Sequence, residues 1–366
     1  MKVFTLHNGC ETNLYDSEKA KGLMLSGENA LAENRNDADL IVFHVCTFAQ
    51  HKEDESKNTI EQLLKTTSKN IVVSGCYLDE YITNERISYV KNENLPAHIS
   101  KLNAVEEAEK QKQKNGAALL PYVQISRGCY GNCTFCSIKS VKGSHKSRPV
   151  SDILADIEQR QHHNTIKLVG DEDAGYGRDI GINLKVLIEA IVKRFPKIKI
   201  KLGSLNAKIL KKFTANELAI LAHENVVGNI HIPIQSASNK VLKDMSRGYT
   251  IEEYAAIYLT LKQLGVKNIS ADIISGFPGE DEQDHKMNLD FISANAFNFM
   301  EVFVYHERQG TKAAEMEQVD FAIREKRATE VIVKYLKSYS KWNNIPYETL
   351  IKQTPVFHTN INFKSK

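Results

Sequence analysis

The chain of 366 residues lacks several features that would restrict its class. It has no run of about 18 apolar residues, the length that a membrane-spanning helix needs. Its apolar start over residues 1–6 is too short for a signal peptide. It has no low-complexity tract and no repeat beyond an alternation of strand-like and helix-like segments. These absences predict a folded cytoplasmic protein with no membrane partner.

A strong charge of either sign is also missing. The net charge is +3 and the pI about 8.3. Dedicated nucleic-acid binders carry clustered charge and a higher pI, and no patch here combines basic clusters with interleaved aromatic residues. The composition permits contact with nucleic acid but gives no positive case for it.

Cysteine is scarce, with six residues in the whole chain. In a cytosolic chain of this size, this number favours metal or redox chemistry over a disulfide framework. Three cysteines are scattered over the first 76 residues, and three lie within eight residues of one another. The spacing suggests two triplets: Cys10, Cys46 and Cys76, then Cys129, Cys133 and Cys136.

The first third of the chain reads as an α/β domain, which we place at residues 1–115. Short apolar or β-branched runs at 3–6, 40–45 and 71–74 have the composition of buried parallel strands. A helix capped by Asp16 or Ser17 is expected to run to about residue 25, and another to cover residues 52–65. Alternation of strands and helices predicts a doubly wound parallel sheet.

A charged stretch over residues 103–117 separates this domain from a second one, placed at residues 118–342. Strand-like runs alternate there with helical stretches, and residues 321–342 read as a closing helix. The pattern predicts a partial (β/α)6 barrel. Residues 343–366 are too few for a further domain. The strand-like runs are 122–126, 166–170, 198–202, 230–234, 269–275 and 300–305.

The second cysteine triplet directly follows the first strand of the predicted barrel, in the sequence CYGNCTFC at 129–136. Barrel active sites lie at the carboxyl ends of the strands. Three thiolates ligate three irons of a [4Fe–4S] cluster and leave the fourth open to a chelating ligand. The amino and carboxylate groups of S-adenosylmethionine (SAM) suit that position. The alternatives are a zinc site, which usually needs a fourth protein ligand, and unligated thiols.

Each cysteine of the first triplet follows one of the three apolar runs of the first domain. Strand ends of a parallel sheet share one edge, where open α/β folds bind ligands. Cys10, Cys46 and Cys76 are therefore expected to meet and to form a second three-cysteine cluster site. The alternative is that they are buried structural cysteines.

At this point the sequence resembles the methylthiotransferase family of radical SAM enzymes over about residues 1–342. Stretches at 13–18, 46–56 and 171–179 are most similar to the RimO-type branch, which modifies an aspartate of a ribosomal protein. The matching segments are GCETN at 9–13, Cys46, Gly75-Cys76, ISRGC at 125–129 with Cys133 and Cys136, SRP at 147–149, IPIQS at 232–236, MSRGY at 245–249, DIISGFPGE at 272–280 and residues 303–310.

The resemblance implies two [4Fe–4S] clusters and two SAM molecules per turnover. It also implies an exogenous sulfur source and a reducing partner such as flavodoxin or ferredoxin. The expected reaction inserts a methylthio group at an unactivated C–H of a protein or peptide side chain, with aspartate as a candidate acceptor. The alternatives are the same chemistry on tRNA and a non-catalytic iron–sulfur carrier or assembly protein.

Two departures from the family pattern concern the substrate. The final residues cannot hold the C-terminal TRAM module that the family usually carries, and Gly170-Asp171 stands where the family usually has Gly-Gln. We nevertheless expect Gly170, Asp171 and Asp173 to face SAM, and Gln235 to bind its ribose or carboxylate. Arg148 and Arg247 are candidate partners for a carboxylate of SAM or substrate. The alternatives are that Asp171 is solvated and that Arg247 caps a helix.

Overall fold

The structure, a computed structural model, describes residues 2–9, 11–25, 30–47, 50–77, 80–92, 94–95, 97–98 and 120–353. The chain divides into two compact units, residues 1–124 with 140–142 (unit 1) and residues 125–139 with 143–366 (unit 2). The predicted boundary between residues 115 and 118 lies outside the described residues. Within the described part of the chain, no helix is long and apolar enough to cross a membrane.

Unit 1 is built on a five-stranded sheet in the order β2-β1-β3-β4-β5, with every neighbouring pair parallel. All six residues of the central strand β3 are buried, as expected for a parallel strand covered on both faces. The three predicted strands are confirmed, and two short edge strands were not predicted. The strands are β1 (Lys2–His7), β2 (Ala30–Leu31), β3 (Leu40–Val45), β4 (Asn70–Gly75) and β5 (Ile87–Tyr89).

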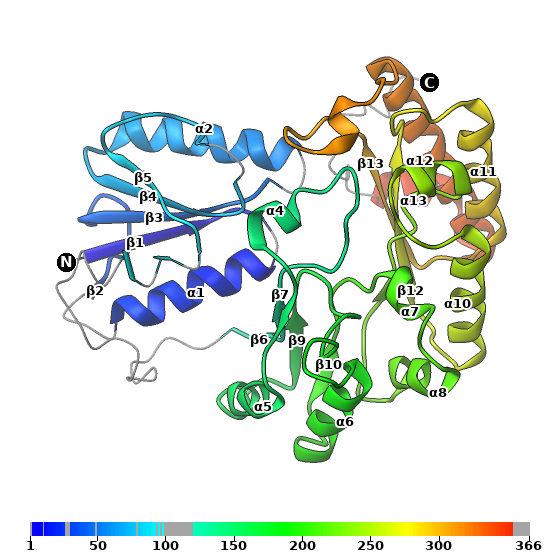
Figure 1. The fold of residues 1–366 in the computed structure, drawn as a ribbon, viewed down its shortest axis with the longest axis horizontal. Helices are drawn as coiled ribbons and strands as arrows, with labels where there is room; N and C mark the ends of the chain where they lie inside the picture. The colour runs from blue at the N-terminus through cyan, green and yellow to red at the C-terminus, as the bar shows by residue number, and fades with distance from the viewer. Residues whose placement is uncertain are drawn as a thin grey trace. The chain divides into compact units, whose positions relative to one another are not determined.

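Two helices cover the opposite faces of this sheet, α1 (Glu11–Leu25) and α2 (Gln50–Thr66), as Figure 1 shows in blue. The doubly wound arrangement is thus confirmed. The predicted helix start at Asp16 or Ser17 is wrong, because both residues lie inside α1 and are buried. Asp16 accepts a hydrogen bond of 2.5 Å from Asn92 Nδ2, so its carboxylate serves a tertiary contact instead of a helix cap.

After the first sheet, the chain forms two three-stranded sheets, ordered β10-β9-β6 and β11-β12-β13, whose strands other than β6 belong to unit 2. A parallel bridge between Ser204 and His231 links the segment after β10 to β11, which gives the sequential strand order of a partial barrel. The six predicted strands are confirmed. They are β6 (Tyr122–Gln124), β9 (Thr165–Val169), β10 (Lys199–Lys201), β11 (Ile230–His231), β12 (Ile269–Ser275) and β13 (Phe299–Val304).

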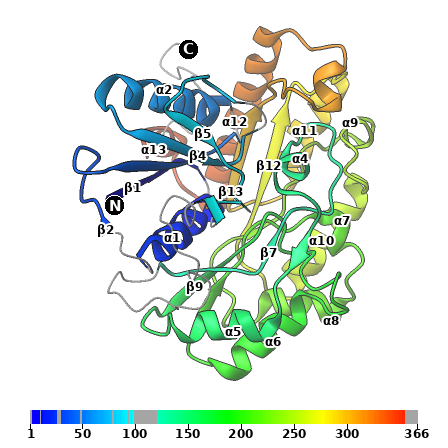
Figure 2. The ribbon, with the colours of Figure 1, turned by 60° about the vertical axis from the view of Figure 1, so that its left-hand side comes forward.

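The helices between these strands pack through one apolar face. In α6 the buried residues Leu184, Leu187, Ile188 and Ile191 have the spacing of one helical face. Helices α5 and α6 lie side by side (Figure 2), and α12, the predicted closing helix, packs on α11 and β13. The longer helices are α5 (Val150–Glu158), α6 (Leu184–Arg194), α10 (Ile251–Gln263), α11 (Glu282–Ala294) and α12 (Phe321–Asn343).

Short elements complete this part of the chain and shape its loops. Strands β7 and β8 form an antiparallel pair. In the sequence, β7 lies before the cysteine loop and β8 lies after it. These elements are β7 (Ser126–Arg127), α4 (Ile138–Lys142), β8 (Lys146–Ser147), α7 (Ala207–Leu210), α8 (Ala215–Leu218), η1 (Ala219–Ala222), α9 (Asn239–Asp244), η2 (Lys312–Glu315) and α13 (Tyr347–Gln353).

Candidate iron–sulfur and SAM site

The loop that carries Cys129, Cys133 and Cys136 begins directly after β7. Gly128 has a φ of 77°, and a Cβ there would lie 2.4 Å from the carbonyl oxygen of Ser144. Only glycine fits this close approach of two backbone segments. The sequence therefore forces a tight turn immediately before the first cysteine of the loop.

The sulfur atoms of Cys129 and Cys133 lie close to the same point beside Gly131. A Cβ added at Gly131 would lie 3.2 Å from Cys129 Sγ and 3.6 Å from Cys133 Sγ. The amide of Gly131 also donates a hydrogen bond of 3.2 Å to Cys129 Sγ. Burial raises the pKa of the Cys129 thiol to about 12, so a thiolate here requires a compensating cation. Iron supplies that charge when it is coordinated.

No three His, Cys, Asp or Glu side chains among the described residues surround a point where one metal ion could bind.

Arg247 reaches the cysteine loop from the segment after α9. The side chain is buried, and its Nη1 donates a hydrogen bond of 3.2 Å to Cys133 Sγ. Its Nε donates to the hydroxyl of Tyr249, and its Nη2 donates to the carbonyl of Pro233. Arg247 thus fixes a positive charge against a predicted cluster ligand. The structure assigns it this contact in place of the helix cap considered from the sequence.

Gly170 and Asp173 lie together at the end of β9. A Cβ at Gly170 would lie 2.6 Å from Ser126 Oγ and 2.7 Å from Asp173 Oδ1. Both of those oxygens are buried without a hydrogen-bond partner among the described residues, while Asp173 Oδ2 accepts a bond of 2.6 Å from the amide of Gly203. Unpaired buried polar atoms call for a ligand or water. These residues fit the polar groups of SAM.

Asp171 contacts the start of the cysteine loop. Its Oδ2 accepts a hydrogen bond of 2.8 Å from the amide of Gly128. The carboxylate that the sequence left open as solvated therefore stabilises the turn before Cys129. Its predicted contact with SAM stays a prediction.

Gln235 and Arg148, two further predicted SAM contacts, differ in their availability. Gln235 is buried, has a φ of 71°, and its side chain makes no hydrogen bond with the described residues. A non-glycine residue held at positive φ stores strain typical of functional sites. Arg148 forms an ion pair of 2.7 Å with Asp156, and its predicted contact with a carboxylate of SAM or substrate stays a prediction.

In unit 1, Cys46 and Cys76 meet at one edge of the sheet. Strands β3 and β4 are parallel with Val45 opposite Gly75, so the two cysteines follow the strands side by side. The amide of Cys76 donates to the carbonyl of Val45 at 2.9 Å. Both cysteines are buried. The predicted convergence of these two residues is confirmed.

Cys10 lies outside the described residues, so its part in the triplet stays a prediction. Its neighbour Gly9 has a φ of 117°, and a Cβ there would lie 2.7 Å from Cys46 Sγ. The chain segment before Cys10 therefore approaches the sulfur of Cys46 as closely as glycine allows.

Two asparagines brace this edge, and neither was assigned a role from the sequence. Asn8 Oδ1 accepts a bond of 2.9 Å from the amide of Cys46. Asn13 Nδ2 donates to the carbonyl of Val45 at 2.7 Å, and its Oδ1 lies 3.6 Å from Cys76 Sγ. The sequence signal that could have identified these asparagines is their closeness to Cys10.

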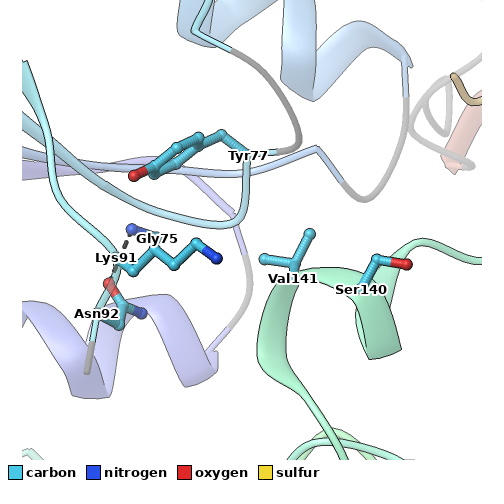
Figure 3. A pocket seen from close by; sticks show the side chains of 6 residues that line it. All are labelled: Gly75, Tyr77, Lys91, Asn92, Ser140 and Val141. Atoms are coloured by element: carbon cyan, nitrogen blue, oxygen red, sulfur yellow. Dashed lines mark hydrogen bonds between the residues drawn. The ribbon is translucent and has the colours of Figure 1, made fainter. Parts of the chain in front are cut away.

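A small pocket opens beside Cys76 in unit 1 (Figure 3). Asn92 Oδ1 accepts hydrogen bonds from the amide of Gly75 and from Ser74 Oγ. The amine of Lys91 extends into the pocket. The lining residues are Gly75, Tyr77, Lys91, Asn92, Ser140 and Val141.

Two family profiles match the chain. The Radical SAM superfamily matches residues 123–292, and the Uncharacterized protein family UPF0004 matches residues 2–93. Among solved structures, the cobalamin-dependent S-adenosylmethionine radical enzyme OxsB superposes with a TM-score of 0.55 at 16% sequence identity. The match covers 93% of this chain and 56% of OxsB. These matches show a radical SAM fold that follows a separate N-terminal domain in the sequence.

The names of curated relatives define the class of radical SAM enzyme more closely. The human threonylcarbamoyladenosine tRNA methylthiotransferase is 29% identical over 100% of this chain and 67% of its own length. The tRNA-2-methylthio-N(6)-dimethylallyladenosine synthase of Thermoanaerobacter pseudethanolicus is 29% identical, over 88% of this chain and 75% of its own length. The chain belongs to the radical SAM methylthiotransferase family.

Membership in this family implies SAM and two [4Fe–4S] clusters, and the residues present fit them. The converging sulfurs of both units, the buried cation of Arg247 and the unpaired oxygens of Ser126 and Asp173 are the supporting observations. The predicted protein or peptide substrate finds no support, since the relatives reported above are tRNA enzymes by name. Membership of the RimO-type branch is consistent with these matches.

Proposed function

We propose that this chain is a tRNA methylthiotransferase that replaces a C–H hydrogen of an adenosine with a methylthio group. The observation that carries the chemistry is the presence of two cysteine sites, one at a parallel-sheet edge and one on the loop after β7. The relatives reported above act, by name, on tRNA adenosines. The chain spans about two thirds of the length of the human relative.

Each unit would hold one cluster. Cys129, Cys133 and Cys136 would hold the cluster of unit 2, and Cys10, Cys46 and Cys76 that of unit 1. Bound together, the clusters and SAM supply a 5′-deoxyadenosyl radical and a methylated sulfur, chemistry that no side chain can provide. The protein must bind, orient and shield these groups.

The side chains of unit 2 divide this work. Arg247 holds a guanidinium against Cys133, where it favours an electron-rich cluster. Ser126 and Asp173 offer buried oxygens to the polar groups of SAM, and Gln235 offers its amide. A low-potential reductant such as flavodoxin or ferredoxin and an exogenous sulfur source complete the proposed system.

The test is an anaerobic reaction of the reconstituted protein with SAM, dithionite, sulfide and tRNA. Digestion of the tRNA and mass spectrometry of its nucleosides detect a methylthio-adenosine. Parallel reactions contain candidate peptides in place of tRNA. The proposal predicts a methylthio product in tRNA alone, together with 5′-deoxyadenosine from SAM.

Two results would contradict the proposal. A methylthio group found on a peptide and absent from tRNA would restore the protein substrate. Iron incorporation without any cleavage of SAM would point to a non-catalytic carrier. A salt-sensitive association with tRNA is expected in addition, because phosphate contacts release counterions.

A further inference from the structure

The interior of the partial barrel carries a polar layer that the cluster chemistry does not use. Interiors of complete (β/α)8 barrels are packed mainly with branched apolar side chains. Here β11 contributes His231, and β12 contributes Ser270 and Asp272. All three lie below the strand ends where the SAM site is expected. An ionisable layer in this position needs an explanation other than packing.

The direction of these side chains follows from β12. Ser270, Asp272 and Ile274 alternate with Ala271 and Ile273, so they share one face of the strand. Ile274 packs in the apolar cluster that includes Phe135 of the cysteine loop. The face that bears Asp272 is therefore the face toward the cysteine loop, the interior of the barrel.

The three polar side chains form one hydrogen-bonded set. His231 Nδ1 lies 3.0 Å from Ser270 Oγ, and His231 Nε2 lies 3.2 Å from Asp272 Oδ2. Burial alone lowers the pKa of His231, but the hydrogen bond and charge of Asp272 raise it above its ordinary value. Both ring nitrogens are thus occupied, and one oxygen of Asp272 is held in a fixed orientation.

The other oxygen of Asp272 is left over. Asp272 is 5% exposed, and its Oδ1 has no hydrogen-bond partner among the described residues. A buried carboxylate oxygen without a donor costs more free energy than most unpaired groups. His231 keeps 24% of its side-chain exposure, so the set is open on its side.

We propose that Asp272, oriented by His231 and Ser270, accepts a hydrogen bond from the exocyclic N–H of the acceptor adenine. This inference rests on the proposed tRNA function and names the part of unit 2 that would read the base. An enzyme that modifies a base must take the base out of its stack and reads it by hydrogen bonds to its edge. A carboxylate is the natural acceptor for an exocyclic amine.

The position of Asp272 suits this role. The backbone carbonyl of Asp272 accepts a hydrogen bond of 2.8 Å from the amide of Gln235. Asp272 is therefore directly bonded to the backbone of a residue that is predicted to contact SAM. Asp272 is a positioning residue for the base and takes no part in the electron transfer.

The test compares two anticodon stem-loop RNAs, one with the target adenosine and one with purine riboside, which lacks the exocyclic amine. Equilibrium binding to the holoprotein is measured for wild type, Asp272→Ala and Asp272→Asn. Wild type should bind the adenosine RNA about 10- to 100-fold more tightly, the range for a hydrogen bond to a charged group. Asp272→Ala should bind both RNAs equally.

The conservative variant separates this role from a structural one. In Asp272→Asn the amide can donate to His231 and keep its oxygen toward the base, so more than half of the discrimination, expressed as log Kd, should remain. Asp290→Asn on the exposed face of α11, where Asp290 pairs with Lys286, is the matched control and should behave as wild type. Iron content and thermal midpoint report on folding.

Equal binding of the two RNAs by wild type would overturn the inference, as would full discrimination in a folded Asp272→Ala protein. A loss in Asp272→Ala of the same size for both RNAs would also overturn it, because that result marks a structural effect. The binding assay needs no turnover. If wild type discriminates between the RNAs but forms no methylthio product, the proposed function fails while the base contact stands.

Discussion

The two cysteine sites are built in different ways. In unit 2 all three cysteines come from one loop of eight residues, next to a buried arginine and an exposed rim. In unit 1 the described cysteines come from the ends of two strands, are fully buried, and are braced by asparagine side chains. The difference suggests a division of work. The site with a buried arginine suits electron transfer, and the more enclosed site suits the holding of a sulfur atom.

The largest effect should follow from loss of the loop site. Cys133→Ala removes a ligand and the sulfur that Arg247 contacts, so formation of 5′-deoxyadenosine from SAM should fall at least about 1000-fold. Chromatographic measurement of 5′-deoxyadenosine under anaerobic reducing conditions reports this step. Undiminished SAM cleavage would remove the loop from the radical chemistry.

Loss of the sheet-edge site should separate the two halves of the reaction. The double change Cys46→Ala and Cys76→Ala should leave SAM cleavage within a few-fold of wild type and abolish methylthio transfer. Measuring 5′-deoxyadenosine and methylthio nucleoside in one reaction gives the ratio directly. If both products fell together, the two sites would not have separate roles.

A smaller effect is expected at Arg247. Replacement by glutamine removes a charge-assisted donor to Cys133 Sγ, which should lower the midpoint potential of the loop cluster by on the order of 60 mV, a tenfold change for one electron. Redox titration followed by electron paramagnetic resonance measures the potential. Arg148→Gln is the control, because Arg148 pairs with Asp156. The midpoint potential of the loop cluster in this variant should match that of wild type. A shift of the same size in both variants would mean that Arg247 has no specific effect on the cluster.

The smallest effect concerns Glu172, which is buried and precedes Asp173 in the sequence. Burial raises the pKa of Glu172 to about 7, although the amide of Asn206 acts in the opposite direction. The unfolded carboxyl loses its proton first as pH rises, so folded stability should fall between about pH 4.5 and 7 and then level off.

The matching measurement is urea unfolding of the cluster-free protein at pH 5 and pH 8. Glu172→Gln keeps the acceptor for Asn206 and removes the charge, so the variant should gain about 2 kcal/mol relative to wild type between the two pH values. Glu189→Gln on the exposed face of α6 should show no such gain. An equal gain for both variants would assign the pH effect to general charge.

The sequence predicts the local features of this molecule better than the distant ones. The strand at 269–275 appears with the predicted bounds, because an apolar run is a local signal. The helix start near Asp16 was wrong because a tertiary bond to Asn92, 76 residues away, replaces the expected cap.

The site shows the same limit. Spacing alone revealed the cysteine loop, since its ligands are neighbours in the chain. The contact between Arg247 and Cys133 spans 114 residues, and the sequence offered the arginine only as a general carboxylate partner. The bond from Asp171 to Gly128 and the set around Asp272 likewise depend on strand register, which no short motif encodes.

The iron content of the anaerobically reconstituted chain tests the two-site account most directly. The account predicts about eight irons in wild type, from two four-iron clusters. It predicts about four in Cys133→Ala and about four in the Cys46→Ala, Cys76→Ala double variant. A wild type with about four irons, unchanged in the double variant, would contradict the account and leave unit 1 without a cluster.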